Sequence, residues 1–181
     1  VIMDSLAESH GSVREAAIDS LVLIANKVSA KQRGIIVKDL QGCQADKNRR
    51  ICDKARDALL ERAHQMGVEV TNHPGHFQGD AEELAAQFCD EMLNGPVGLV
   101  LWGGESSVVL PEKPGRGGRN QHFALAAARY LSGHENVLLL CVGTDGSDGP
   151  TEDAGALVDG GTVQRGEWEG LSVIDALEMA D

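Results

Sequence analysis

The sequence predicts an α/β protein with a mixed, mostly parallel β-sheet and flanking helices. Two observations lead to this fold class. Short apolar segments typical of strands alternate with longer segments in which apolar residues recur at helical spacing. In addition, 42% of the 181 residues are hydrophobic, which is enough to bury a sizeable core in one medium domain or two small ones.

The first half of the chain is expected to contain three helices and two strands. The pattern Ser-x-x-Glu that begins at Ser12 is a capping box, which predicts a helix start. Gly67 suits the position after a helix end, and Asp80 suits an N-cap because glutamates follow it in the first turn. The expected helices cover residues 12–29, 48–66 and 80–94, the expected strands cover 34–37 and 68–71, and residues 72–79 are expected to form a loop.

The second half is expected to be richer in strands. Residues 97–102 are mostly apolar and predict a strand, and the glycines that follow predict a turn into a return strand over 106–110. Such a hairpin breaks the strict alternation of strand and helix, so the sheet is expected to be mixed. The other expected elements are helices over 121–132 and 162–169, strands over 137–142 and 156–158, and a last helix that begins after Ser172 and runs to the chain end.

The composition of the chain changes near residue 95. Before this point helices and charged residues dominate, and after it glycine and short strands do. This change predicts a domain boundary, with a partial N-terminal α/β lobe or connecting segment over residues 1–95 and a second α/β domain over 96–181.

The charge balance and the hydropathy pattern exclude several classes of protein. The formal net charge is −12, and an acidic protein repels the phosphates of nucleic acids. No apolar run approaches the roughly 18 residues that a membrane span needs. Acidic residues stand near the N-terminus where a signal peptide requires basic ones, and the four cysteines lie far apart with no Cys-x-x-Cys pair. We therefore expect a cytoplasmic protein that binds neither nucleic acid nor membranes.

The segment GRGGRNQ (115–121) is the strongest candidate for a binding loop. Its three glycines free the backbone to approach a ligand closely, and Arg116 and Arg119 add positive charge to an acidic protein. Asn120 stands where a helix N-cap is expected, and a helix start beside two arginines is suited to bind an anion. The alternative is a surface loop with two solvated arginines.

The segment GTDGSDGPT (143–151) directly follows an apolar strand. Ligands of open α/β sheets bind beyond the carboxyl ends of strands, so Asp145 and Asp148 are candidate ligands of magnesium or of a substrate hydroxyl. The alternative is an ordinary Asp-Gly turn.

The segment GGESS (103–107) also follows a strand, and its Glu105 is a candidate acid, metal ligand or turn residue. If the three loops converge at one sheet edge, they combine arginines with carboxylates, which is the combination that phosphoryl transfer requires.

These three segments, together with the residues that extend them, resemble a known family. GGESS (103–107), GRGGRNQHFALAAA (115–128) and GTDGSDGPTEDAGALVDGGT (143–162) are similar to the MOFRL region of class III glycerate kinases. Residues 48–95 look compatible with the segment that precedes this region, whereas residues 1–47 do not align with the family. The resemblance implies two α/β domains with the active site between them, and ATP- and Mg²⁺-dependent phosphorylation of D-glycerate to 2-phosphoglycerate. It leaves a homodimer possible.

The resemblance also assigns site residues. Arg119 would stabilise the transferred phosphate or the substrate carboxylate, and it is expected to be catalytic together with Asp145. Asp145 and Asp148 are the expected metal ligands. The expected substrate- or phosphate-binding residues are Gly104, Glu105, Arg116, Gly117, Gly118, Asn120, Thr144 and Gly146.

Two departures from the family keep other functions open. The catalytic lysine of the family's N-terminal lobe is not located in this chain, and the family's glycine- and threonine-rich phosphate loop is not found before Asp181. The chain therefore looks like a partial enzyme, with a MOFRL-like domain truncated at its C-terminal end. Some family members carry the name hydroxypyruvate reductase, but the chain has no G-x-G-x-x-G fingerprint for NAD(P)H. The third hypothesis is a non-catalytic fragment that binds nucleotide or glycerate.

Overall fold

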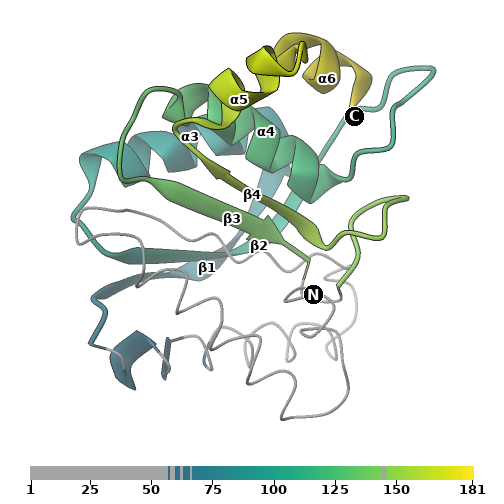
Figure 1. The fold of residues 1–181 in the computed structure, drawn as a ribbon. Helices are drawn as coiled ribbons and strands as arrows, with labels where there is room; N and C mark the ends of the chain where they lie inside the picture. Colours follow the sequence, from purple (N-terminus) through teal and green to yellow (C-terminus); the bar gives the residue numbers. More distant parts are fainter. Residues whose placement is uncertain (1–56, 58–59, 62, 66, 144–145) are drawn as a thin grey trace.

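The computed structural model describes residues 57, 60–61, 63–65, 67–143 and 146–181 (Figure 1). The helix predicted over 12–29, the strand predicted over 34–37 and most of the helix predicted over 48–66 lie outside these residues. The described elements are β1 (Val70–Asp80), α3 (Ala81–Asn94), β2 (Leu99–Ser107), α4 (Arg119–Leu131), β3 (Leu138–Val142), β4 (Gly155–Asp159), α5 (Thr162–Trp168) and α6 (Val173–Met179).

The strands pair in two ways. Strand β1 runs parallel to β2, with α3 as the connection between them, and β3 runs antiparallel to β4. The helices α3, α4, α5 and α6 lie above the strands in Figure 1. The predicted α/β class, with parallel strands and flanking helices, is confirmed; the described strands form one parallel and one antiparallel pair rather than a single mixed sheet.

The predicted hairpin over residues 97–110 is wrong. Strand β2 continues through the two glycines at 103–104 and stays in parallel register with β1 as far as Ser107. Gly104 serves packing, because a side chain at this position would overlap the backbone and ring of Phe77 in the neighbouring strand. Glycine in a strand often marks such a close approach of two backbones.

The loop predicted over residues 72–79 is also wrong, because β1 spans this segment. After a register shift between Asn72 and His76, residues from His76 to Asp80 pair with β2 from Gly103 to Ser107. The segment contains a proline and two glycines, which local preference places outside strands. Pairing with β2 overrides that preference.

The helix ends agree with the sequence at some positions and not at others. The Asp80 carboxylate caps α3 by accepting the N–H of Glu82 at 2.9 Å, as predicted. Helix α4 begins at Arg119 with Gly118 as its N-cap, so the prediction that Asn120 is the cap is wrong. Helix α6 ends before the last residue, because Ala180 adopts a left-handed conformation with φ 52°.

One hydrophobic core joins α3, α4 and the strands. Phe88 of α3 stacks on Trp102 of β2, with ring centroids 4.6 Å apart, and Phe123 of α4 packs beside Phe88. The thiols of Cys89 and Cys141 are buried in the same core. Apolar side chains from both sides of residue 95 share this core. The domain boundary at residue 95 stays a prediction. No helix in the described part of the chain is long and apolar enough to cross a membrane.

Candidate active site

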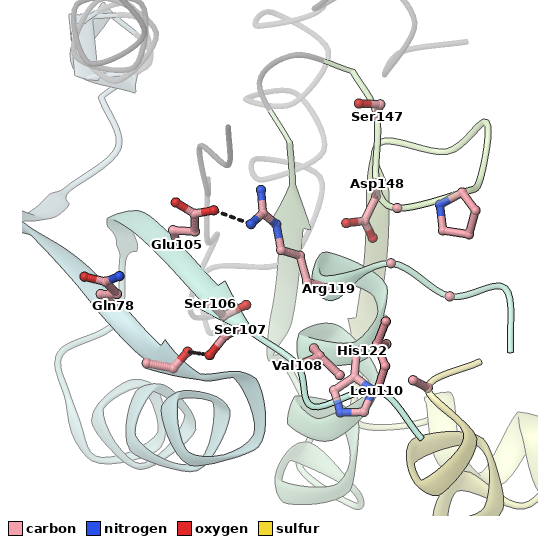
Figure 2. A pocket seen from close by; sticks show the side chains of 16 residues that line it. Gln78, Glu105, Ser106, Ser107, Val108, Leu110, Arg119, His122, Ser147 and Asp148 are labelled. Atoms are coloured by element: carbon pink, nitrogen blue, oxygen red, sulfur yellow. Dashed lines mark hydrogen bonds and ion pairs between the residues drawn. The ribbon is translucent and has the colours of Figure 1, made fainter. Parts of the chain in front are cut away.

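A cavity of about 700 Å³ lies where β1 and β2 end and α4 begins (Figure 2). Its walls come from the last residues of β1 and β2, the first turn of α4 and residues 147–150. Polar groups come from the side chains of Gln78, Glu105, Ser106, Ser107, Arg119, His122, Ser147 and Asp148. The carboxyl ends of parallel strands are the usual place for a ligand in α/β proteins, and a volume of this size suits a small organic ligand.

Arg119 and Glu105 form an ion pair inside this cavity. An Nη1 group of Arg119, the first residue of α4, donates a hydrogen bond to Oε1 of Glu105 in β2 (Figure 2). Both side chains are partly buried, with 32% of the Arg119 side chain and 25% of the Glu105 side chain exposed. The GRGGRNQ segment (115–121) and the GGESS segment (103–107) thus meet at this ion pair.

Asp148 caps the start of α4. Its side chain is 2% exposed, and its carboxylate accepts the backbone N–H of Asn120 at 2.9 Å and of Gln121 at 2.8 Å. The amide of Gln121 donates a further hydrogen bond to the same carboxylate at 3.2 Å. A carboxylate at a helix N-terminus satisfies backbone donors that have no partner within the helix, and it also interacts favourably with the helix dipole.

Glycines allow the two loops to approach this closely. A side chain at Gly118 would overlap Asp148, and Gly149 has φ +61° with its missing Cβ position only 2.9 Å from the Cα of Gly118. Thr151 closes the contact, because its Oγ1 accepts a hydrogen bond from Gln121 Nε2 at 2.9 Å and donates one to the Asp148 carbonyl at 2.7 Å. Residues 118–121 and 148–151 therefore pack as one unit.

The structure places several of the predicted site residues in the cavity and others elsewhere. Glu105, Gly117, Gly118, Arg119 and Asp148 line it, whereas Thr144 and Asp145 lie outside the described residues. Gly104 and Gly146 are described but do not line the cavity, and the strand position of Gly104 is explained by the approach of Phe77.

Arg116 and Asn120 do not reach the cavity either. Arg116 is exposed, and its backbone N–H donates to Asp181 Oδ1 at 2.8 Å. Asn120 is fully buried, where its Oδ1 accepts from the Cys141 thiol and its Nδ2 contacts the Ala154 carbonyl at 3.5 Å. The placement of Arg119 at the first helical position turns Asn120 into the protein interior.

His122 is a cavity residue that sequence reasoning missed. It follows Arg119 by three residues, so both side chains lie on one side of α4 (Figure 2). Burial lowers the pKa of His122, while the carboxylates of Glu82 and Asp80 oppose this shift. His122 Nε2 lies 3.7 Å from Glu82 Oε1. Helical spacing from Arg119 is the signal that could have found this residue.

The hydroxyl and amide groups of the strand ends were also missed as binding groups. Gln78, Ser106 and Ser107 line the cavity, and Ser107 Oγ donates to the Gly79 carbonyl at 3.2 Å. A signal for the two serines was present in the sequence, because both belong to the GGESS segment.

The described residues include only one of the two predicted metal ligands, Asp148. Among them, no group of three or more His, Cys, Asp or Glu residues could hold a metal ion. Glu105 is paired with Arg119, and both carboxylate oxygens of Asp148 accept N–H groups.

Known proteins resemble this chain over the region that carries the cavity. Residues 98–181 match the MOFRL family. The chain is 38% identical over 120 residues to D-glycerate 2-kinase of Thermotoga maritima, which covers 64% of this chain and 28% of that protein. It is 41% identical over 131 residues to glycerate 2-kinase of Pyrococcus horikoshii, which covers 67% of this chain and 29% of that protein. The crystal structure of glycerate kinase from Thermotoga maritima matches with a TM-score of 0.62 and 31% identity, over 74% of this chain and 33% of that one.

The chain thus spans less than a third of the length of these two curated relatives. The matched segment nevertheless contains β2, α4 and residues 147–150, which supply most of the cavity wall. The resemblance inferred from the three glycine-rich segments is confirmed, because residues 98–181 match the MOFRL family.

Proposed function

We propose that this chain supplies the substrate cavity of a glycerate kinase, which transfers the γ-phosphoryl group of ATP to D-glycerate and forms 2-phosphoglycerate. The observation that carries the proposal is the position of Arg119. It places a guanidinium in a cavity at the carboxyl ends of two parallel strands, within a segment whose relatives are named glycerate kinases.

Arg119 would bind the carboxylate of D-glycerate or the transferred phosphate. A guanidinium presents several N–H donors in one plane, and this geometry matches both anions. Gln78, Ser106 and Ser107 also line the cavity and would bind the substrate hydroxyls. In the reaction the attacking hydroxyl oxygen bonds to the γ-phosphorus, the bond from that phosphorus to the bridging oxygen breaks, ADP leaves and the hydroxyl proton is released. Positioning and charge stabilisation supply most of the catalysis in such reactions.

Asp148 has a positioning role in this proposal, in place of the metal-binding role predicted from the sequence. Its hydrogen bonds fix the first turn of α4, and this turn carries Arg119. Mg²⁺ would accompany ATP, since it usually binds substrate phosphates and retains several waters. Asp145 remains the candidate carboxylate for that ion, and Thr144 and Gly146 remain candidate phosphate-binding residues.

A coupled assay of ADP release tests this function. With ATP, Mg²⁺ and D-glycerate, this chain is expected to release ADP only when D-glycerate is present, and the Thermotoga maritima enzyme serves as the positive control. Oxidation of NADH that depends on hydroxypyruvate, without ADP release, would contradict the proposal and favour a reductase. Calorimetric binding of D-glycerate without either reaction would instead favour a non-catalytic binding fragment.

A further inference from the structure

The cavity arginine is already paired with an anion of the protein itself. Oε1 of Glu105 accepts a hydrogen bond from Nη1 of Arg119, and both side chains line the cavity. A ligand carboxylate or phosphate that approaches Arg119 therefore meets an occupied site.

Rigid elements fix both partners of this pair. Glu105 lies within β2 and stands opposite Gln78 in the parallel register with β1. Arg119 is the first residue of α4, whose start is held by the buried carboxylate of Asp148. Two side chains carried by a strand and a capped helix lose less freedom on pairing than two side chains on a mobile surface. The ion pair is thus part of the architecture of the cavity.

The charge balance of the cavity opposes simple anions. Among the described residues that line it, Arg119 is the only lysine or arginine, whereas Glu105 and Asp148 are both acidic. The backbone N–H groups at the start of α4 do not compensate, because those of Asn120 and Gln121 are bound by Asp148. A small anion with no other anchor must displace Glu105 or remain beside it in a partly buried, like-charged environment.

We propose that Glu105 is a specificity-determining residue, which competes with ligand anions for Arg119 and thereby keeps inorganic phosphate out of the cavity. This inference rests on the proposed function for the identity of the favoured ligand. A carboxylate that also carries hydroxyl groups can offset the competition through Gln78, Ser106 and Ser107, whereas inorganic phosphate gains less from these groups. Phosphate also carries more negative charge than a monocarboxylate near pH 7, so the repulsion by Glu105 weighs more heavily on it.

The test is calorimetric titration of the chain with inorganic phosphate and with D-glycerate. Glu105→Gln removes the charge and keeps the shape, and Glu112→Gln is the matched control at an exposed position with the same change in net charge. The expected result is that Glu105→Gln binds phosphate about tenfold more tightly or better, and D-glycerate with a smaller gain. The control is expected to bind both ligands as the wild type does.

Unchanged or weaker phosphate binding by Glu105→Gln would overturn the inference. If Glu105 only positioned Arg119, its neutralisation would lower the affinity of the cavity for anions. If this variant does not fold, Glu105→Asp draws the charge back by one methylene and is expected to bind phosphate more tightly than the wild type; equal or weaker binding would again overturn the inference. These titrations need no turnover. A chain without kinase activity whose Glu105→Gln variant gains phosphate affinity would contradict only the proposed function, and an active chain without that gain would contradict only this inference.

Discussion

At the scale of single residues, the site depends on side chains whose charge is set by their surroundings. His122 is buried and lies on the same side of α4 as Arg119, with its Nε2 atom 3.7 Å from Oε1 of Glu82. Burial favours the uncharged imidazole more than the nearby carboxylates favour the charged one, so its pKa in the folded protein is below the ordinary value of 6.5. With His122 neutral, Arg119 is the one cationic side chain among the described residues that line the cavity.

This pKa shift predicts a pH dependence of stability. The unfolded chain takes up a proton on His122 near pH 6.5, but the folded chain does so only at lower pH. The free energy of unfolding is therefore expected to decrease as the pH falls below about 6.5, until the folded imidazole is protonated as well. His122→Asn is expected to reduce this decrease in urea unfolding measured between pH 7.5 and 5.

The exposed His134 provides the matched control, because His134→Asn removes an imidazole that is in contact with solvent. This control is expected to keep the pH dependence of the wild type. If His122→Asn and His134→Asn respond to pH alike, the burial of His122 does not set its protonation.

At the scale of elements, the helices and apolar strands followed from the sequence because their signals are local. The N-cap at Asp80 and the apolar run of β3 depend only on neighbouring residues. The predictions of a hairpin over 97–110 and of a loop over 72–79 were wrong, because β1 and β2 form through pairing with each other. Gly104 looks like a turn residue in isolation, and only the approach of Phe77 explains why a strand contains it.

The candidate site was predictable to a similar extent. The three glycine-rich segments identified the loops that meet at the cavity, and Glu105 and Arg119 were found among them. The sequence did not indicate which loop residues point inward, because that depends on where α4 begins. Its start at Arg119 sends Asn120 into the core and brings His122 to the cavity.

The contact between the two loops predicts a loss of stability when the Asp148 cap is changed. Asp148→Asn keeps the shape but replaces an acceptor oxygen with a donor that faces backbone N–H groups. We expect the free energy of unfolding to fall by about 1–2 kcal/mol. The same substitution at the exposed Asp153 is the control, with an expected change of less than about 0.5 kcal/mol. A loss at Asp148 no larger than that at Asp153 in urea unfolding would contradict the capping role.

At the scale of the whole molecule, the protein is acidic, and the guanidinium of Arg119 lies in the cavity. The net charge of the chain is −12. The residues that line the cavity come from the ends of two strands, the start of α4, two loops and Ala180 after α6. Most of these residues fall within the segment that matches the MOFRL family. The chain spans under a third of the length of these curated relatives.

In the proposed kinase, Arg119 binds the anionic group of the substrate. Calorimetric titration of D-glycerate into the wild type, Arg119→Ala and Arg129→Ala tests this role, and the last variant removes an exposed arginine near the other end of α4. We expect Arg119→Ala to weaken binding by about tenfold or more, since a charge-assisted contact in a partly buried site is lost. Arg129→Ala is expected to bind as the wild type does. Equal D-glycerate affinity in the wild type and in a folded Arg119→Ala variant would show that Arg119 does not bind the substrate anion.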